Sequence, residues 1–171
     1  MSVNNKTFTK YINAVKDILN SKEFELYHKA FKKFDKIIIL GNGGSNSIAS
    51  HISQDMVKFH NKNSLCFSDP SMLTCFINDF GMNNAYVKFL EYYCDKDTFV
   101  ILISSRGESK NIINCVNYLN KNNIFFGVLT GFKKNNKVNK LSKKAIFNYH
   151  VKSNNYGVVE CTHQIFLHGV I

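Results

Sequence analysis

The chain has 171 residues, of which 44% are hydrophobic, so it is long enough for one domain with a full core. It shows no stretch of signal-peptide or transmembrane character. Its net charge of +10 does not indicate a nucleic-acid partner, because the lysines are mostly scattered and Arg106 is the only arginine. The five cysteines are odd in number and show no C-x-x-C spacing, which favours a reducing cytoplasm.

Apolar residues at helical spacing predict two leading helices, over residues 4–20 and 22–34, which we interpret as an oligomer surface. The β-branched run Ile37–Leu40 then predicts a strand buried on both faces, followed by a helix to about residue 59. The remaining expected elements are a strand at 64–67, helices from Pro70 and over 84–93, a strand at 98–103, a helix over 109–121, strands at 124–129 and 145–151, and a helix over 158–171.

Strands that alternate with helices imply right-handed crossovers and a doubly wound parallel sheet of about five strands in three α/β/α layers. We therefore expect one domain over 1–171, with the helical pair in 1–34 and the α/β core in 35–171. The lysine cluster at 133–144 is interpreted as a solvated loop, with a nucleic-acid patch as the alternative. The helical pattern still runs at Ile171, so we expect either a continuing chain or a missing tail.

Two loops rich in glycine and serine follow predicted strands: Gly41–Ser45 (GNGGS) and Ser104–Ser109 (SSRGES). Glycine permits close backbone approach, Ser45 is expected at a helix N-cap, and the start of a helix favours anions. Each loop alone is also consistent with a tight turn that holds no ligand. Because both follow the carboxyl ends of strands, we predict that they lie side by side and share one phosphate.

Histidines and carboxylates lie on two of the predicted helices. His51 and Asp55 are four residues apart and share a face, so they can share a metal, although a surface hydrogen bond is the alternative. On the last helix, Glu160 and His163 share a face, and His168 is about two turns beyond Glu160. Taken alone, each of these three is also consistent with a structural polar residue.

The order of these motifs resembles the sugar-isomerase (SIS) domain family and, within it, the phosphoheptose isomerases. The motifs are GNGGS, His-x-x-x-acid, SDPS, NDFG, S-S-x-G-x-S and a late His-x-x-x-x-His. The resemblance implies a cytoplasmic homotetramer with active sites at subunit interfaces. It also implies interconversion of sedoheptulose 7-phosphate and D-glycero-D-manno-heptose 7-phosphate, which supplies heptose for surface polysaccharide.

The resemblance assigns roles to individual residues. The implied zinc ligands are His51, Asp55, Glu160 and His168. The implied substrate-binding residues are Asn42, Gly43, Gly44, Ser45, Asn78, Asp79, Ser104, Ser105, Arg106 and Ser109. Because Glu160 and His168 are about 12 Å apart along a straight helix, we expect a site of His51, Asp55 and His168, with Glu160 as fourth ligand or nearby base.

The chain departs from the family pattern at three of these positions. Asp55 stands in place of Glu, Glu160 in place of Gln, and Arg106 in place of a phosphate-loop serine, where a guanidinium could pair with the phosphate. An aldose–ketose shift through an enediol needs a base, an acid and positive charge on the oxygen. We assign Asp55 as base and His168 as acid, with Glu160 as base if zinc holds Asp55. The alternatives are an isomerase of another phosphosugar, or a non-catalytic SIS protein that senses phosphosugars or acts as an adaptor.

Overall fold

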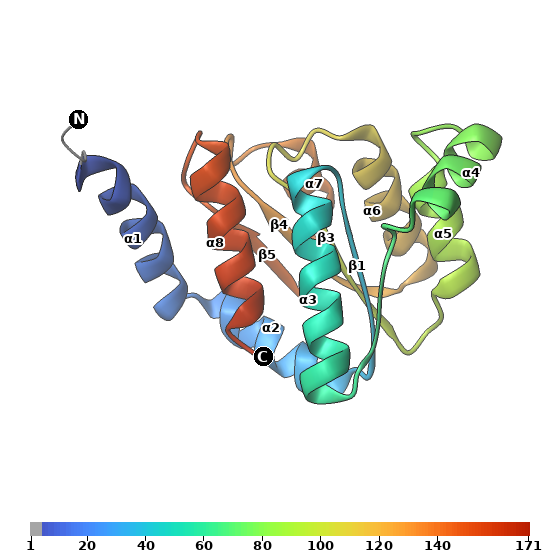
Figure 1. Cartoon of the computed structure of the whole chain (residues 1–171), viewed down its shortest axis with the longest axis horizontal. Coiled ribbons are helices and arrows are strands. Elements are labelled where there is room, and N and C mark those ends of the chain that lie inside the picture. The colour runs from blue at the N-terminus through green and yellow to red at the C-terminus, as the bar shows by residue number, and fades with distance from the viewer. Residues whose placement is uncertain (1–4) are drawn as a thin grey trace.

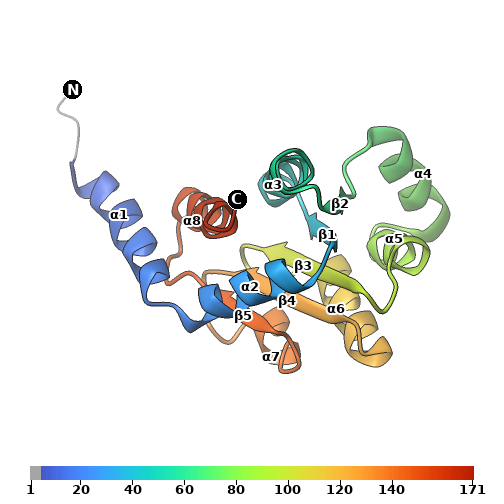
Figure 2. The same cartoon turned by 90° about the horizontal axis from the view of Figure 1, so that it is seen from below.

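A computed structural model describes residues 5–171, which form a parallel sheet between two layers of helices (Figures 1 and 2). The strands are Lys36–Gly41 (β1), Asn63–Cys66 (β2), Thr98–Ser104 (β3), Phe125–Thr130 (β4) and Phe147–His150 (β5). Their order is β2-β1-β3-β4-β5 and every pair of neighbours is parallel. The predicted doubly wound α/β fold is therefore confirmed.

The helices cover the two faces of this sheet. Their bounds are Asn5–Leu19 (α1), Lys22–Lys33 (α2), Gly44–His60 (α3), Pro70–Phe80 (α4), Ala85–Tyr93 (α5), Lys110–Asn122 (α6), Lys137–Leu141 (α7) and Tyr156–His168 (α8). Side chains of α2, α3 and α8 form the core on one face, and those of α5, α6 and α7 belong to the core on the other. The elements predicted from sequence are present, with bounds that differ by a few residues.

The central strands explain why the sequence shows unbroken apolar runs. Ile37 and Ile39 of β1 belong to one core, whereas Ile38 and Leu40 belong to the other. All four side chains have no exposed surface, because successive side chains of a strand point to opposite faces. A strand covered on both faces must be apolar at every position, and this is the pattern from which β1 was predicted.

The lysine-rich segment 133–144 differs from its prediction as a solvated loop, because it contains α7 and several buried side chains. Asn136 caps α7 and lies so close to Gly107 that a Cβ at Gly107 would collide with its amide. The amide N–H of Val138 donates to the Gly107 carbonyl at 3.0 Å. This segment therefore packs against the serine loop at Gly107 and helps to hold it in place, which the lysine-rich composition of the segment does not indicate.

The two ends of the described chain lie along the same face. Helix α1 contacts α8 but projects from the body of the molecule, and it exposes Phe8, Ile12 and Leu19 (Figure 1). Helix α8 ends at His168, so the expected helical pattern does not reach Ile171. Among residues 5–171, no helix is both long and apolar enough to cross a membrane. The five cysteines are free thiols.

Candidate active site

The two loops predicted to share a ligand open into one cavity. They follow β1 and β3, which are neighbours with Gly41 paired to Ile103, so both loops emerge at the same edge of the sheet. The cavity has a volume of about 190 Å³. Its lining residues are Asn42, Ser45, Ile103, Ser104, Ser105, Arg106, Ser109, Tyr156 and Glu160. The prediction that the loops lie side by side is therefore confirmed.

The glycines of the first loop determine where α3 begins. Gly43 is the N-cap, with a φ of 54° that glycine adopts readily, so Ser45 lies inside the first turn and its predicted N-cap position is wrong. A Cβ at Gly44 would lie 2.7 Å from Oε2 of Glu160, so this glycine makes room for a carboxylate from α8. The loop thus brings the start of α3 against Glu160.

Hydrogen bonds from outside the two motifs hold the loops in place. Asn42 and Asn111 exchange two amide hydrogen bonds, of 3.0 and 2.8 Å, which tie the glycine loop to the first turn of α6. The buried Tyr86 hydroxyl donates to the Gly41 carbonyl at 2.7 Å. Burial raises the pKa of Tyr86 to about 12, which keeps that donor protonated. Neither Asn111 nor Tyr86 was identified from the sequence.

The cavity has hydrogen-bonding capacity that the protein itself does not use. Ser105 is 6% exposed, and its Oγ has no hydrogen-bond partner among the described residues. Leaving a buried hydroxyl unpaired is costly, and a ligand with acceptor oxygens would pair it. The N-termini of α3 and α6 lie at the same edge and favour negative charge, and Ser109 is the N-cap residue of α6 although its side chain makes no capping hydrogen bond. These features suit a phosphate group.

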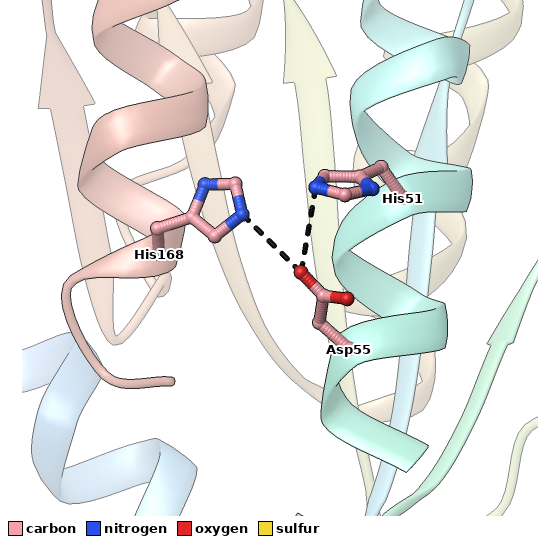
Figure 3. Close-up of side chains that lie close together, drawn as sticks. All are labelled: His51, Asp55 and His168. Carbon is pink, nitrogen blue, oxygen red and sulfur yellow. Dashed lines mark hydrogen bonds and ion pairs between the residues drawn. The ribbon is translucent and has the colours of Figure 1, made fainter. Parts of the chain in front are cut away.

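A second cluster lies farther along α3 and α8, which run side by side (Figures 1 and 2). Figure 3 shows His51 and Asp55 from α3 facing His168 from α8. Oδ2 of Asp55 lies 3.4 Å from Nε2 of His51 and 3.3 Å from Nε2 of His168. One ligand atom from each of the three lies within 4.8 Å of the others. We call these three residues the triad.

The hydrogen bond at Nδ1 of His168 determines which ring nitrogen carries the proton when the imidazole is neutral. Its Nδ1 lies 3.0 Å from the Gln164 carbonyl, which can only accept, so Nδ1 must donate. A neutral His168 then turns the lone pair of Nε2 toward an Asp55 carboxylate oxygen. Two acceptors in contact require a cation between or beside them, either a proton or a metal ion. Two imidazole nitrogens and a carboxylate oxygen are ligands that zinc commonly takes.

Glu160 and His163 lie outside the triad. Glu160 faces the serine cavity, about 12 Å along the α8 axis from His168, and within the described chain it does not join the cluster of possible ligands. His163 is fully buried and its Nε2 donates to the Thr130 carbonyl at 3.0 Å. Burial lowers the pKa of His163 to about 4, so the ring is neutral and supports the fold.

Asn78 and Asp79 also lie apart from the serine cavity. Both are exposed in the last turn of α4, and neither lines that cavity. Asp79 lines a different cavity, between α4 and α5, together with Cys75 and aromatic side chains. A single chain therefore does not bring these two residues to the proposed ligand.

Comparison with known proteins supports the resemblance. No model of a known protein family matches the chain. It is 29% identical over 116 residues to a phosphoheptose isomerase from Cytophaga hutchinsonii, covering 65% of this chain and 61% of that protein. It is 34% identical over 92 residues to one from Glaesserella parasuis, covering 51% of this chain and 48% of that protein. The chain thus spans about half to three-fifths of the length of the curated relatives it matches.

The structural comparison extends over nearly the whole chain. The structure of phosphoheptose isomerase from Neisseria gonorrhoeae superposes with a TM-score of 0.88 at 21% identity, covering 97% of this chain and 93% of that one. This likeness confirms the fold, and the sequence matches confirm the predicted similarity to phosphoheptose isomerases.

Proposed function

We propose that this chain, a SIS-domain relative of the phosphoheptose isomerases, is an aldose–ketose isomerase that interconverts sedoheptulose 7-phosphate and D-glycero-D-manno-heptose 7-phosphate. The observation that supports this most is the division of the site into two parts. An anion cavity lies at the start of α3 and α8, and the triad lies farther along the same two helices. A phosphosugar would place its phosphate in the first part and its reacting carbons at the second.

The spacing of the two parts favours a long substrate in its open-chain form. Gly44 at the cavity and His51 in the triad are about 10 Å apart along the axis of α3. With bonds of about 1.5 Å meeting at about 111°, a carbon chain advances about 1.25 Å per bond. Phosphorus is separated from C2 by seven bonds in a heptose 7-phosphate, about 9 Å, but by five in a pentose 5-phosphate, about 6 Å.

The triad has the groups that the proposed reaction needs. His51, Asp55 and His168 would hold the metal, for which zinc is the first choice, and the bound ion would supply positive charge to the oxygen that becomes the enediolate. Oδ2 of Asp55 faces both imidazoles, so Oδ1 remains to take the proton from carbon. His168, oriented by its bond to the Gln164 carbonyl, is the proposed acid in a site without metal, where Nε2 would carry the proton beside Asp55. With a metal on Nε2, the ion itself would stabilise the developing negative charge on the substrate oxygen. Glu160 lies too near the phosphate end to replace Asp55 within one chain.

The proposed assembly is a homo-oligomer, with a tetramer and interface active sites as the specific form. Phe8, Ile12 and Leu19 are exposed on α1, which projects from the body and would bury an apolar stripe on association. Asn78 and Asp79, exposed and away from the serine cavity, would reach a substrate only in another copy. The proposed setting is the cytoplasm, where the product would supply heptose for surface polysaccharide.

The test is direct conversion of substrate. Protein loaded with zinc is incubated with sedoheptulose 7-phosphate, and the aldose product is followed by NMR, with ribulose 5-phosphate in a parallel reaction. Product from the heptulose alone supports the proposal, and product from ribulose 5-phosphate alone favours another phosphosugar. Binding of both sugars without turnover by the zinc-loaded protein would indicate a phosphosugar sensor instead.

A further inference from the structure

Glu160 places a carboxylate in a cavity that is otherwise suited to an anion. Its oxygens lie over Gly44 at the first residue of α3, where the helix N-terminus stabilises negative charge. The other polar lining groups are serine hydroxyls, the Tyr156 hydroxyl, an Asn42 amide and the Arg106 guanidinium. A carboxylate near a bound phosphate raises the energy of the complex by like-charge repulsion. The position of Glu160 therefore works against tight binding of phosphate alone.

Arg106 contributes the opposite charge from the serine loop. It is exposed and lines the same cavity as Glu160. Over residues 5–171, the ion pairs do not include one between these two side chains, so each remains available to a ligand. Ser105 also lines this cavity, and its buried Oγ has no hydrogen-bond partner among the described residues, so it is free to donate to an acceptor oxygen of a ligand.

We propose that Glu160 is a specificity-determining residue that selects phosphate esters carrying hydroxyl groups on the carbons next to the phosphate. Its carboxylate only accepts hydrogen bonds, so a hydroxyl donor from the ligand satisfies it, whereas an ester without hydroxyls leaves it unpaired beside a phosphate. Arg106 pairs with the phosphate and offsets the charge of Glu160. This inference rests on the proposed function, since it assumes that the phosphate of the ligand enters this cavity.

The test compares two ligands of equal charge that differ in hydroxyl groups. Dissociation constants for methyl phosphate and glycerol 1-phosphate are measured by isothermal titration calorimetry. We expect the wild-type protein to bind glycerol 1-phosphate about tenfold more tightly, as one charge-assisted hydrogen bond would give. In Glu160→Gln, methyl phosphate should bind more tightly than in wild type. The ratio of the dissociation constants of methyl phosphate and glycerol 1-phosphate, which we call the preference, should fall toward one.

Two further variants separate a specific effect of Glu160 on the preference from a general effect of charge in the serine loop. Arg106→Ser should weaken both ligands by a similar factor and leave the preference unchanged. Glu108→Gln is the matched control, because Glu108 belongs to the same loop but bonds to Lys137 outside the cavity, and it should bind as wild type does. Equal binding of both ligands by wild type, or an unchanged preference in Glu160→Gln, would overturn the inference. Failure of wild type to bind either ligand or inorganic phosphate would overturn the proposed phosphate cavity itself.

Discussion

Replacing His51 by Ala should abolish zinc-dependent stabilisation while leaving the fold intact. The His51 side chain is 50% exposed, so its removal creates no buried cavity, yet it is one of three ligand groups in the triad. A metal at 100 times its dissociation constant stabilises a protein by about 2.7 kcal/mol. For a domain of this size, each kcal/mol corresponds to about 2–4 °C in Tm. We therefore expect zinc to raise the Tm of the wild-type protein by about 5–11 °C and that of the variant by much less.

The assay is a thermal melt with increasing zinc, paired with elemental analysis of the purified protein. His28→Ala is the matched control, because His28 is an exposed histidine on α2, outside the triad, and its loss should leave the zinc response unchanged. Without added zinc, His51→Ala should melt within a few degrees of wild type. A wild-type protein that contains no metal and shows no response, or a variant that keeps the full response, would refute the metal site.

Three other perturbations follow from the contacts of single residues. Ser104→Ala should raise KM several-fold and change kcat little, since a phosphate donor acts equally on ground and transition states. Tyr86→Phe should lower the free energy of unfolding by about 1 kcal/mol in urea titrations, because the Gly41 carbonyl loses its partner. His163 binds its proton more weakly when folded, with a pKa of about 4 against 6.5, so stability should fall as the pH drops from 6.5 to 4. The loss should approach 3 kcal/mol, and a His163→Gln variant should show a flatter pH dependence.

The fold was predictable because its central strands are unambiguous in sequence. The runs Ile37–Leu40 and Thr98–Ser104 are apolar at every or nearly every position, which only a strand covered on both faces requires. Helix α7 was not predictable, since five residues are too few to show a period. Val138 is buried there by tertiary contacts with α6 and β4 rather than by any local pattern. Local sequence therefore shows strong strands and long helices, but not a short segment ordered by its neighbours.

The candidate site was likewise only partly predictable from the sequence. The glycine and serine loops were predicted to meet because parallel strands end at one edge, and the structure places them around one cavity. Tyr86 supports Gly41 from 45 positions away, a relation that no motif records. Glu160 was grouped with the metal ligands by resemblance, whereas the rise of α8 keeps it at the serine cavity in a single chain.

Chain-length selectivity should appear in kcat rather than in binding, because helix geometry fixes the distance from cavity to triad. A pentose 5-phosphate can place its phosphate among the serines as a heptose 7-phosphate does, but its C2 would stop about 2.5 Å short of the position that a heptose reaches. Misplacement on this scale removes the reacting carbons from the base while phosphate contacts persist. Ribulose 5-phosphate should therefore inhibit competitively, with an inhibition constant near the KM for sedoheptulose 7-phosphate, and turn over at least about 100-fold more slowly. Equal kcat values for the two sugars would contradict the two-part site, because turnover at the triad would then not depend on the length of the sugar's carbon chain.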